Sequence, residues 1–203
     1  MPGQVAAMMH AHTMLERRRT QEGLLHTPVC QVSEREGGML TLELSGPLPH
    51  DWCLRLASGL SATDIGLQNG YARRIESDLW ICRFELQPAT PPERLPDFLE
   101  LALRGTLRRR RNEPPILDFQ LSERADGQGT LELRVVARDA VGLLASVLHR
   151  VRAVGLAVEE LVLATEGDAA THRISIQRRE GTPAQPIDRR AMATSLSQLL
   201  RSG

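Results

Sequence analysis

The stretch of the chain with the clearest chemical character runs from Asp139 to Leu144, in the order Asp-Ala-Val-Gly-Leu-Leu. Its last residue, Leu144, begins a series of apolar residues at helical spacing that continues with Val147, Leu148, Val151 and Val154. A helix N-terminus presents free amide donors and partial positive charge, which suits a carboxylate, and a glycine there lets a ligand approach the backbone. Asp139 is also well placed as the N-cap of this helix, and Gly155 is predicted to end it. A second interpretation therefore stays open, in which Asp139 only caps the helix and Gly142 only packs.

Histidines beside carboxylates are the other candidates for catalysis or metal binding. His50 and Asp51 are adjacent, but they precede a short helix, whereas a metal-dependent hydrolase needs more histidines and carboxylates on a helical bundle. His10 and His12 are two residues apart, a spacing that does not place them on one helical face. The chain contains neither a phosphate-binding glycine motif nor a hydrolase nucleophile motif. The sequence therefore predicts no catalytic site, no metal site and no cofactor, and we expect that the chain is not an enzyme.

Composition and charge argue against several functional classes. The formal net charge is zero and the pI is about 7.0, so no global field would attract nucleic acid or an anionic membrane. Residues 108–111 are four consecutive arginines, but no aromatic side chains lie nearby to stack on bases. The cysteines are odd in number and lack CxxC spacing, which disfavours a disulfide framework and a zinc site. Because neither a secretory signal nor an apolar stretch of about 18 residues is evident, the expected compartment is the cytoplasm.

The chain also contains an internal repeat. The segment QVSEREGGMLTLEL begins at Gln31, and QLSERADGQGTLEL begins at Gln120, with nine of fourteen positions identical in an ungapped alignment. In each copy two strand-like segments are joined by a Gly-bearing turn, which predicts a β-hairpin. Self-similarity of this kind indicates two structural units of the same type.

After the hairpin, each copy is predicted to form a helix, two more strands and a closing helix. The first helix of the first copy, near residues 51–59, is expected to be shorter than its counterpart. Each copy then has the order ββαββα, which predicts an α+β fold of two tandem ferredoxin-like modules, each with a four-stranded antiparallel sheet and helices on one face. The leading strand is expected to take the outer position of a 4-1-3-2 sheet. The predicted domains are an N-terminal helical arm at 1–27 and modules at 28–111 and 112–203.

The second copy resembles an ACT domain, a small regulatory module of ferredoxin-like topology. The resemblance lies in LELRVVARDAVGLLASVLHRVRAVGLAVEELVLAT, where a strand ends, D-x-x-G-L-L opens a helix, and Gly155-Leu156 leads into the next strand. The tandem arrangement, with a leading strand before each copy, is similar to the C-terminal ACT pair of the uridylyltransferase/uridylyl-removing enzymes of PII nitrogen signalling. No uridylyltransferase-like catalytic motif is found in this chain.

The resemblance implies binding of an amino acid where two modules meet, followed by regulation of a partner protein. The implied ligand-binding residues are Asp139, Ala140, Val141, Gly142, Leu143 and Leu144, with Asp139 holding an α-ammonium group or capping the helix. Glutamine is the first ligand to try, by analogy. The alternative is a ligand-free scaffold that forms homo-oligomers through its sheet edges. In the first copy Leu54 is aligned with Gly142, so packing rather than ligand binding is expected there.

Overall fold

The computed structural model describes residues 27–76, 78–89, 95–107, 114–124, 130–178 and 186–201. The predicted N-terminal arm, apart from Thr27, and the arginines at 108–111 lie outside these ranges. In chain order the elements are β1 (Val29–Glu34), η1 (Glu36–Gly38), β2 (Leu40–Pro47), α2 (Trp52–Ala62), β3 (Ile65–Arg74), β4 (Leu79–Pro88), α3 (Phe98–Arg104), β5 (Ile116–Glu123), β6 (Leu131–Arg138), α4 (Leu143–Ala153), β7 (Leu156–Glu166), β8 (Ala169–Arg178) and α5 (Pro186–Arg201).

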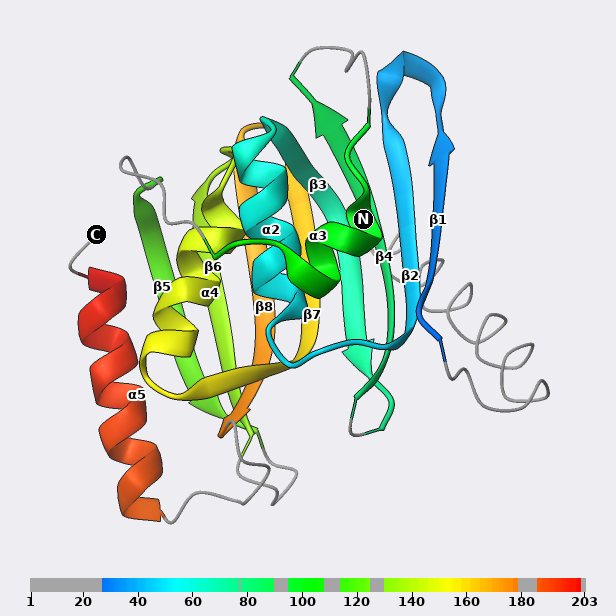
Figure 1. Cartoon of the computed structure of the whole chain (residues 1–203). Coiled ribbons are helices and arrows are strands. Elements are labelled where there is room, and N and C mark those ends of the chain that lie inside the picture. The colour runs from blue at the N-terminus through cyan, green and yellow to red at the C-terminus, as the bar shows by residue number, and fades with distance from the viewer. Residues whose placement is uncertain are drawn as a thin grey trace.

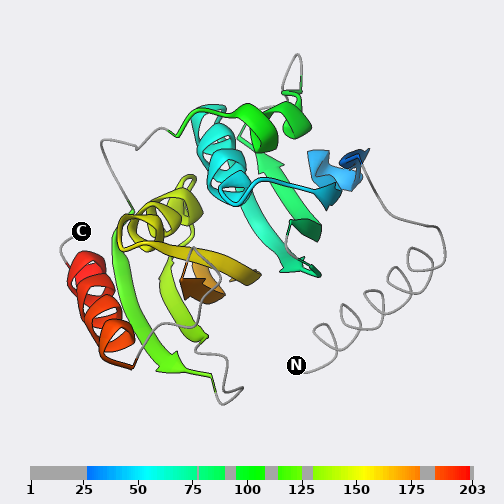
Figure 2. The ribbon, with the colours of Figure 1, turned by 60° about the horizontal axis from the view of Figure 1, so that its bottom comes forward.

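The described strands form one eight-stranded antiparallel sheet in the order β1-β2-β4-β3-β7-β8-β6-β5. The helices cover one face of this sheet (Figures 1 and 2). Within each half, the leading strand lies at the outer edge beside the second strand, as predicted. The fold class is therefore confirmed as two tandem ferredoxin-like modules of order ββαββα. Strands β3 and β7 pair with each other, so the sheets of the two modules join edge to edge.

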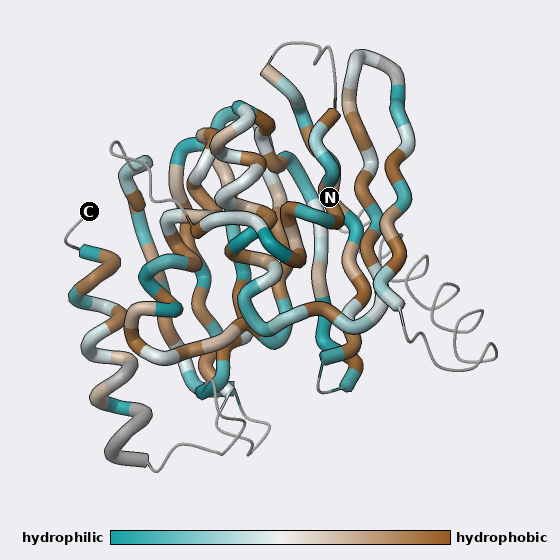
Figure 3. The backbone as a smooth tube through the Cα atoms, viewed as in Figure 1, coloured by the Kyte–Doolittle hydropathy of each residue, from teal (hydrophilic) through white to brown (hydrophobic). Residues whose placement is uncertain are grey.

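Alternation of apolar and polar side chains explains why these segments form half-buried strands. In β6 the buried residues are Leu131, Leu133, Val135 and Ala137, while every intervening side chain is more exposed. The same alternation is visible along the strands in Figure 3. Their inward side chains pack against the apolar faces of α2 and α4 in a continuous core. Full burial of one such side chain contributes about 1.5–3 kcal/mol, so the sheet-and-helix core supplies most of the stabilisation.

Helix boundaries agree with the sequence in part. Helix α4 ends at Ala153, and Gly155 beyond it has φ 77°, the left-handed conformation in which glycine ends helices, as predicted. Helix α2 is as long as α4, at 11 residues, so the expectation of a shorter first helix is wrong. Within the described residues, α3 covers only Phe98–Arg104; it begins after Asp97, whose side chain accepts a hydrogen bond from the Glu100 amide at 2.9 Å. Among the described helices, none has the length and apolar character needed to span a lipid bilayer.

The structural register of the repeat differs from the ungapped sequence alignment. Strands β2 and β6 begin at Leu40 and Leu131, 91 residues apart, and α2 and α4 keep this same offset. The repeated phrases begin in β1 and β5, before the hairpin turn, and there the two copies are 89 residues apart. The turn of the second hairpin is two residues longer, so the offset after the turn is 91 residues. Leu54 therefore corresponds to Ala145, and the alignment of Leu54 with Gly142 is wrong. A shift of about one helical turn keeps apolar residues matched with apolar residues, so the sequence pattern could not detect it.

Candidate functional site

The two modules meet along β3–β7 and between the helices α2 and α4. Polar contacts also cross the junction. Arg74 forms an ion pair with Glu159, and the Asn69 side-chain oxygen accepts a hydrogen bond from the Thr165 amide at 3.2 Å. Because the sheet is continuous across these contacts, the two modules form one packed unit at this point.

Two small cavities lie at the junction and are related by the repeat. The Gly142 cavity is lined from the second module by Asp139, Ala140, Gly142, Leu143, Leu144, Ala145 and His172, and from the first by Ala57, Leu60, Ser61, Ile65 and Leu67. The Asp51 cavity is lined from the first module by His50, Asp51, Cys53 and Leu54, and from the second by Leu148, Val151, Arg152, Leu156, Ala157 and Val158. The wall of each cavity thus has two parts. One is the loop before α2 or α4, and the other is the C-terminal end of the partner helix together with the strand that follows it, β7 or β3.

The loop at the Gly142 cavity contains the residues singled out in the sequence. Gly142 is the N-cap residue of α4 and has φ 92°, a conformation that favours glycine. A glycine has no side chain with which to cap the helix, so the amides of Leu144 and Ala145 in its first turn receive no cap side chain. The Leu143 amide, by contrast, donates to the Ala140 carbonyl oxygen at 3.1 Å. The cap residue therefore supplies no side-chain acceptor to the amides of this first turn.

The prediction that Asp139 caps α4 is wrong. Asp139 stands three residues before the cap position, and its Oδ2 accepts a hydrogen bond from Gln68 Nε2 of the first module at 3.1 Å. Its backbone amide donates a hydrogen bond to the Asp168 carbonyl oxygen at 2.8 Å, which links the residue that follows β6 to the residue that precedes β8. The carboxylate is half-buried and lines the cavity. Asp139 is thus a negative group of the cavity wall whose neutral partner comes from across the junction.

The remaining predicted residues divide between the cavity and its surroundings. The side chains of Leu143 and Leu144 are buried, Ala140 is exposed, and all three line the cavity. Val141 is half-buried, and its side chain comes close to Gly66 at the start of β3. The predicted segment therefore contributes five of its six residues to the cavity wall, while Val141 lies against the first module.

His172 is a polar residue of this cavity that the sequence analysis missed. It lies on the inward face of β8 and is only 4% exposed, and its Nδ1 has no hydrogen-bond partner among the described residues. Burial lowers its pKa to about 4, so the imidazole is neutral at physiological pH. The signal was present in the alternation of β8, because His172 is two residues before Ile174 and four before Ile176, both of which face the core.

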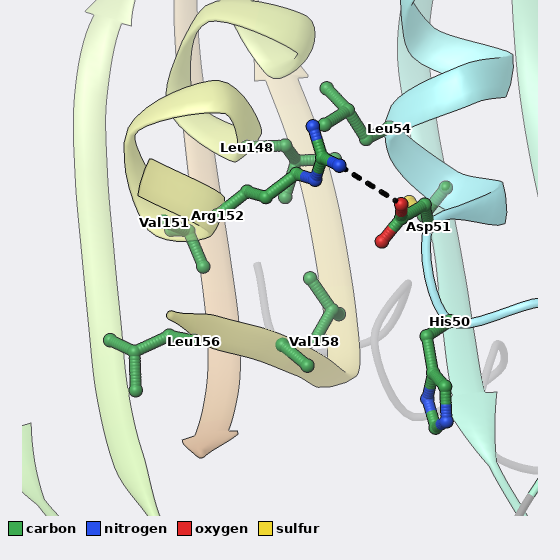
Figure 4. Close-up of a pocket in the computed structure, with 10 residues that line it drawn as sticks. His50, Asp51, Leu54, Leu148, Val151, Arg152, Leu156 and Val158 are labelled. Atoms are coloured by element: carbon green, nitrogen blue, oxygen red, sulfur yellow. Dashed lines mark ion pairs between the residues drawn. The ribbon is translucent and has the colours of Figure 1, made fainter. Parts of the chain in front are cut away.

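The Asp51 cavity is larger and more charged. Its volume is about 30 Å³, compared with about 10 Å³ for the Gly142 cavity. Arg152 of α4 reaches across the junction, and its Nη2 lies 3.5 Å from Asp51 Oδ2 (Figure 4). Asp51 stands at the position that Gly142 occupies in the second module, so a carboxylate replaces the open backbone there. We expected packing at this loop; Leu54 is indeed buried, but a cavity lies beside it.

Metal-binding and thiol chemistry find little support at the junction. Among the described residues, no group of three or more His, Cys, Asp or Glu side chains could hold a metal ion. Figure 4 shows His50 pointing away from Asp51. Burial raises the pKa of Cys53 to about 12, so its thiol in the wall of the Asp51 cavity is protonated and inert.

Comparisons with known proteins do not assign this chain to a family. No family model matches the chain, and no curated protein matches it. Among solved structures, it is similar to the crystal structure of aspartate kinase from Synechocystis, with 9% sequence identity and a TM-score of 0.44. The alignment covers 80% of this chain and 27% of that chain, so the present chain spans about a quarter of that structure's length.

Proposed function

We propose that this chain is a regulatory protein built from two ACT-type modules, which binds an amino acid in the Gly142 cavity and thereby modulates a partner protein. The observation that carries the proposal is the composition of that cavity. It combines the first turn of α4, which has no capping side chain, the carboxylate of Asp139, and His172, whose Nδ1 has no hydrogen-bond partner among the described residues; both modules form its wall. The D-x-x-G-L-L resemblance to ACT domains supports the same assignment.

The ligand's two charged groups would find complementary partners at opposite sides of the loop. Its α-carboxylate would accept hydrogen bonds from the amides of Leu144 and Ala145, where the helix dipole adds partial positive charge. Its α-ammonium group would pair with Asp139 and displace the side-chain amide of Gln68. A cation is a stronger hydrogen-bond partner for a carboxylate than a neutral amide is. Gly142 leaves the approach to these amides clear because it carries no Cβ.

Binding would be coupled to a change at the junction between the modules. The Gly142 cavity holds about 10 Å³, room for about one water molecule, so an amino acid enters only when the junction opens. The hydrogen bond from Gln68 to Asp139 crosses that junction and would break on binding. A ligand that binds the open arrangement better shifts the population towards it, and a partner that contacts both modules would sense the difference.

We further propose that the chain has no catalytic activity or cofactor and that it acts in the cytoplasm, as its sequence predicted. Glutamine and a role in nitrogen regulation rest on the uridylyltransferase likeness alone. The alternative is a ligand-free scaffold that associates through its exposed sheet edges, and the small volume of the Gly142 cavity favours this alternative.

A thermal-shift screen of the full chain with the twenty proteinogenic amino acids separates the two. A ligand present at about 100 times its dissociation constant stabilises the native state by about 2.7 kcal/mol, which raises Tm by about 5–10 °C for a chain of this size. Asp139→Asn should abolish that shift, since it removes the charge that pairs with the ammonium group. Asp51→Asn is the matched control, because it neutralises the carboxylate at the other cavity and should leave the shift intact.

The absence of a shift with any amino acid would refute the proposed function and favour the scaffold. Loss of the shift in Asp51→Asn, with retention in Asp139→Asn, would instead place the ligand in the Asp51 cavity.

A further inference from the structure

We propose that the Gly142 cavity selects a small amino acid whose side chain carries a hydroxyl group, and that His172 is the residue that makes the selection. This inference rests on the proposed function, and it adds the chemical class of the ligand to that site.

The argument begins with the unpartnered nitrogen. His172 is 4% exposed, it lines the Gly142 cavity, and its Nδ1 makes no hydrogen bond within the described part of the chain. A buried polar atom without a partner destabilises the native state, so a ligand that supplies the missing hydrogen bond gains affinity at that position. The occupant of the cavity should therefore present a hydrogen-bonding group to His172.

A hydroxyl group fits this nitrogen better than a charged group does. Burial keeps the imidazole neutral, and Nδ1 is then a donor in one tautomer and an acceptor in the other. A hydroxyl both donates and accepts, so it pairs with either tautomer, whereas a carboxylate only accepts and an ammonium group only donates. Placing a second charge in this buried space would also carry a desolvation cost that no opposite charge offsets.

The rest of the wall limits the size and polarity of the side chain. Opposite the loop, the first module contributes the apolar side chains of Ala57, Leu60, Ile65 and Leu67, together with one buried polar side chain, that of Ser61. No positively charged side chain lines the cavity in the described residues, so an acidic ligand side chain would lack a partner. The cavity has a volume of about 10 Å³, so the junction must open less for a ligand with a short side chain than for one with a long side chain. Serine and threonine meet these conditions.

Isothermal titration of the full chain with two pairs of amino acids tests the inference. Valine has nearly the shape of threonine without its hydroxyl, and alanine relates to serine in the same way. We expect the hydroxylated member of at least one pair to bind about 10- to 100-fold more tightly, because the apolar member leaves Nδ1 unpaired. His172→Leu should reduce that ratio to about one. His149→Leu is the control, since His149 lies on α4 but lines neither cavity.

The outcomes separate this inference from the proposed function. If an amino acid binds, and Asp139→Asn abolishes binding, but hydroxylated and apolar members bind equally, the role of His172 is refuted while the proposed function stands. A preference for the hydroxyl that persists in His172→Leu refutes the inference as well. If no amino acid binds the parent protein, both fall together.

Discussion

Burial of His172 should make the stability of the fold depend on pH between about 6.5 and about 4. The pKa of this imidazole is lowered by burial from 6.5 to about 4 in the native state. In this window the unfolded chain takes up a proton that the native state does not bind, so protonation favours unfolding. The free energy of unfolding is therefore unaffected by His172 above about pH 6.5 and falls as the pH drops towards 4.

The size of the effect follows from the two pKa values. One pKa unit corresponds to about 1.4 kcal/mol, so the shift of His172 is worth about 3 kcal/mol once the pH lies below both values. Between pH 7 and pH 5 the unfolded imidazole becomes almost fully protonated while the native one stays neutral. The contribution of His172 over that interval is about 2 kcal/mol, which is a large fraction of the stability of an ordinary domain.

Urea unfolding at pH 7 and pH 5 measures this contribution when the parent is compared with His172→Leu and His172→Gln. Neither variant has an ionisable group at this position, so the parent should lose about 2 kcal/mol more than either of them over the interval. His172→Leu also removes the unpartnered polar atom, whereas His172→Gln keeps a polar side chain. If all three proteins lose the same free energy, His172 is not buried as a neutral imidazole, and the argument for its role in ligand selection loses its basis.

Other substitutions test the loops on either side of the junction. Gly142→Leu should destabilise the protein by about 1–2 kcal/mol, because φ at this position is 92°. It should also abolish amino-acid binding, because the backbone at this position must stay open to the ligand. Unchanged stability in urea unfolding would contradict the left-handed conformation. Leu54→Ala should cost about 2–5 kcal/mol by the same measurement, since Leu54 is buried, with binding per folded molecule unchanged by calorimetry. A double-mutant cycle on Asp51 and Arg152 should give a coupling energy below about 1 kcal/mol that decreases with added salt, because Arg152 is 40% exposed; a large, salt-independent value would mean a buried pair. Cys53 should resist iodoacetamide until urea unfolds the chain, as peptide mapping would show, because burial raises its thiol pKa to about 12.

The arrangement of the elements could be predicted from the sequence because it depends on short-range patterns. Alternation of apolar and polar residues predicts the strands, and apolar residues at helical spacing predict α4. Gly155 follows the end of α4 in a left-handed conformation, which glycine adopts more readily than other residues do. The repeated hairpin then implied two modules of the same type. Chain connectivity leaves few ways to place a leading strand in a ferredoxin-like sheet, so the outer position of β1 and β5 followed as well.

The register between the copies was decided by loop length, which the repeat concealed. The second hairpin has a longer turn, and the helices tolerate a shift of one turn without a mismatch of apolar residues. The sequence alignment therefore places Leu54 opposite Gly142, whereas the structure places Asp51 there. The cap position of α4 was misjudged for a related reason: Asp139 is a suitable capping residue by type, but the chain needs three more residues to turn from β6 into the helix.

The candidate site itself was decided by the tertiary structure. Asp139 could be singled out from its own segment, but its partner Gln68 and the cavity residue His172 come from distant parts of the chain. They meet only because β3 pairs with β7 and brings the end of α2 against the loop before α4. The burial of His172, and the lack of a partner for its Nδ1 among the described residues, are consequences of that packing. Sequence spacing encodes which face of a strand a side chain occupies, but not which distant residues cover that face.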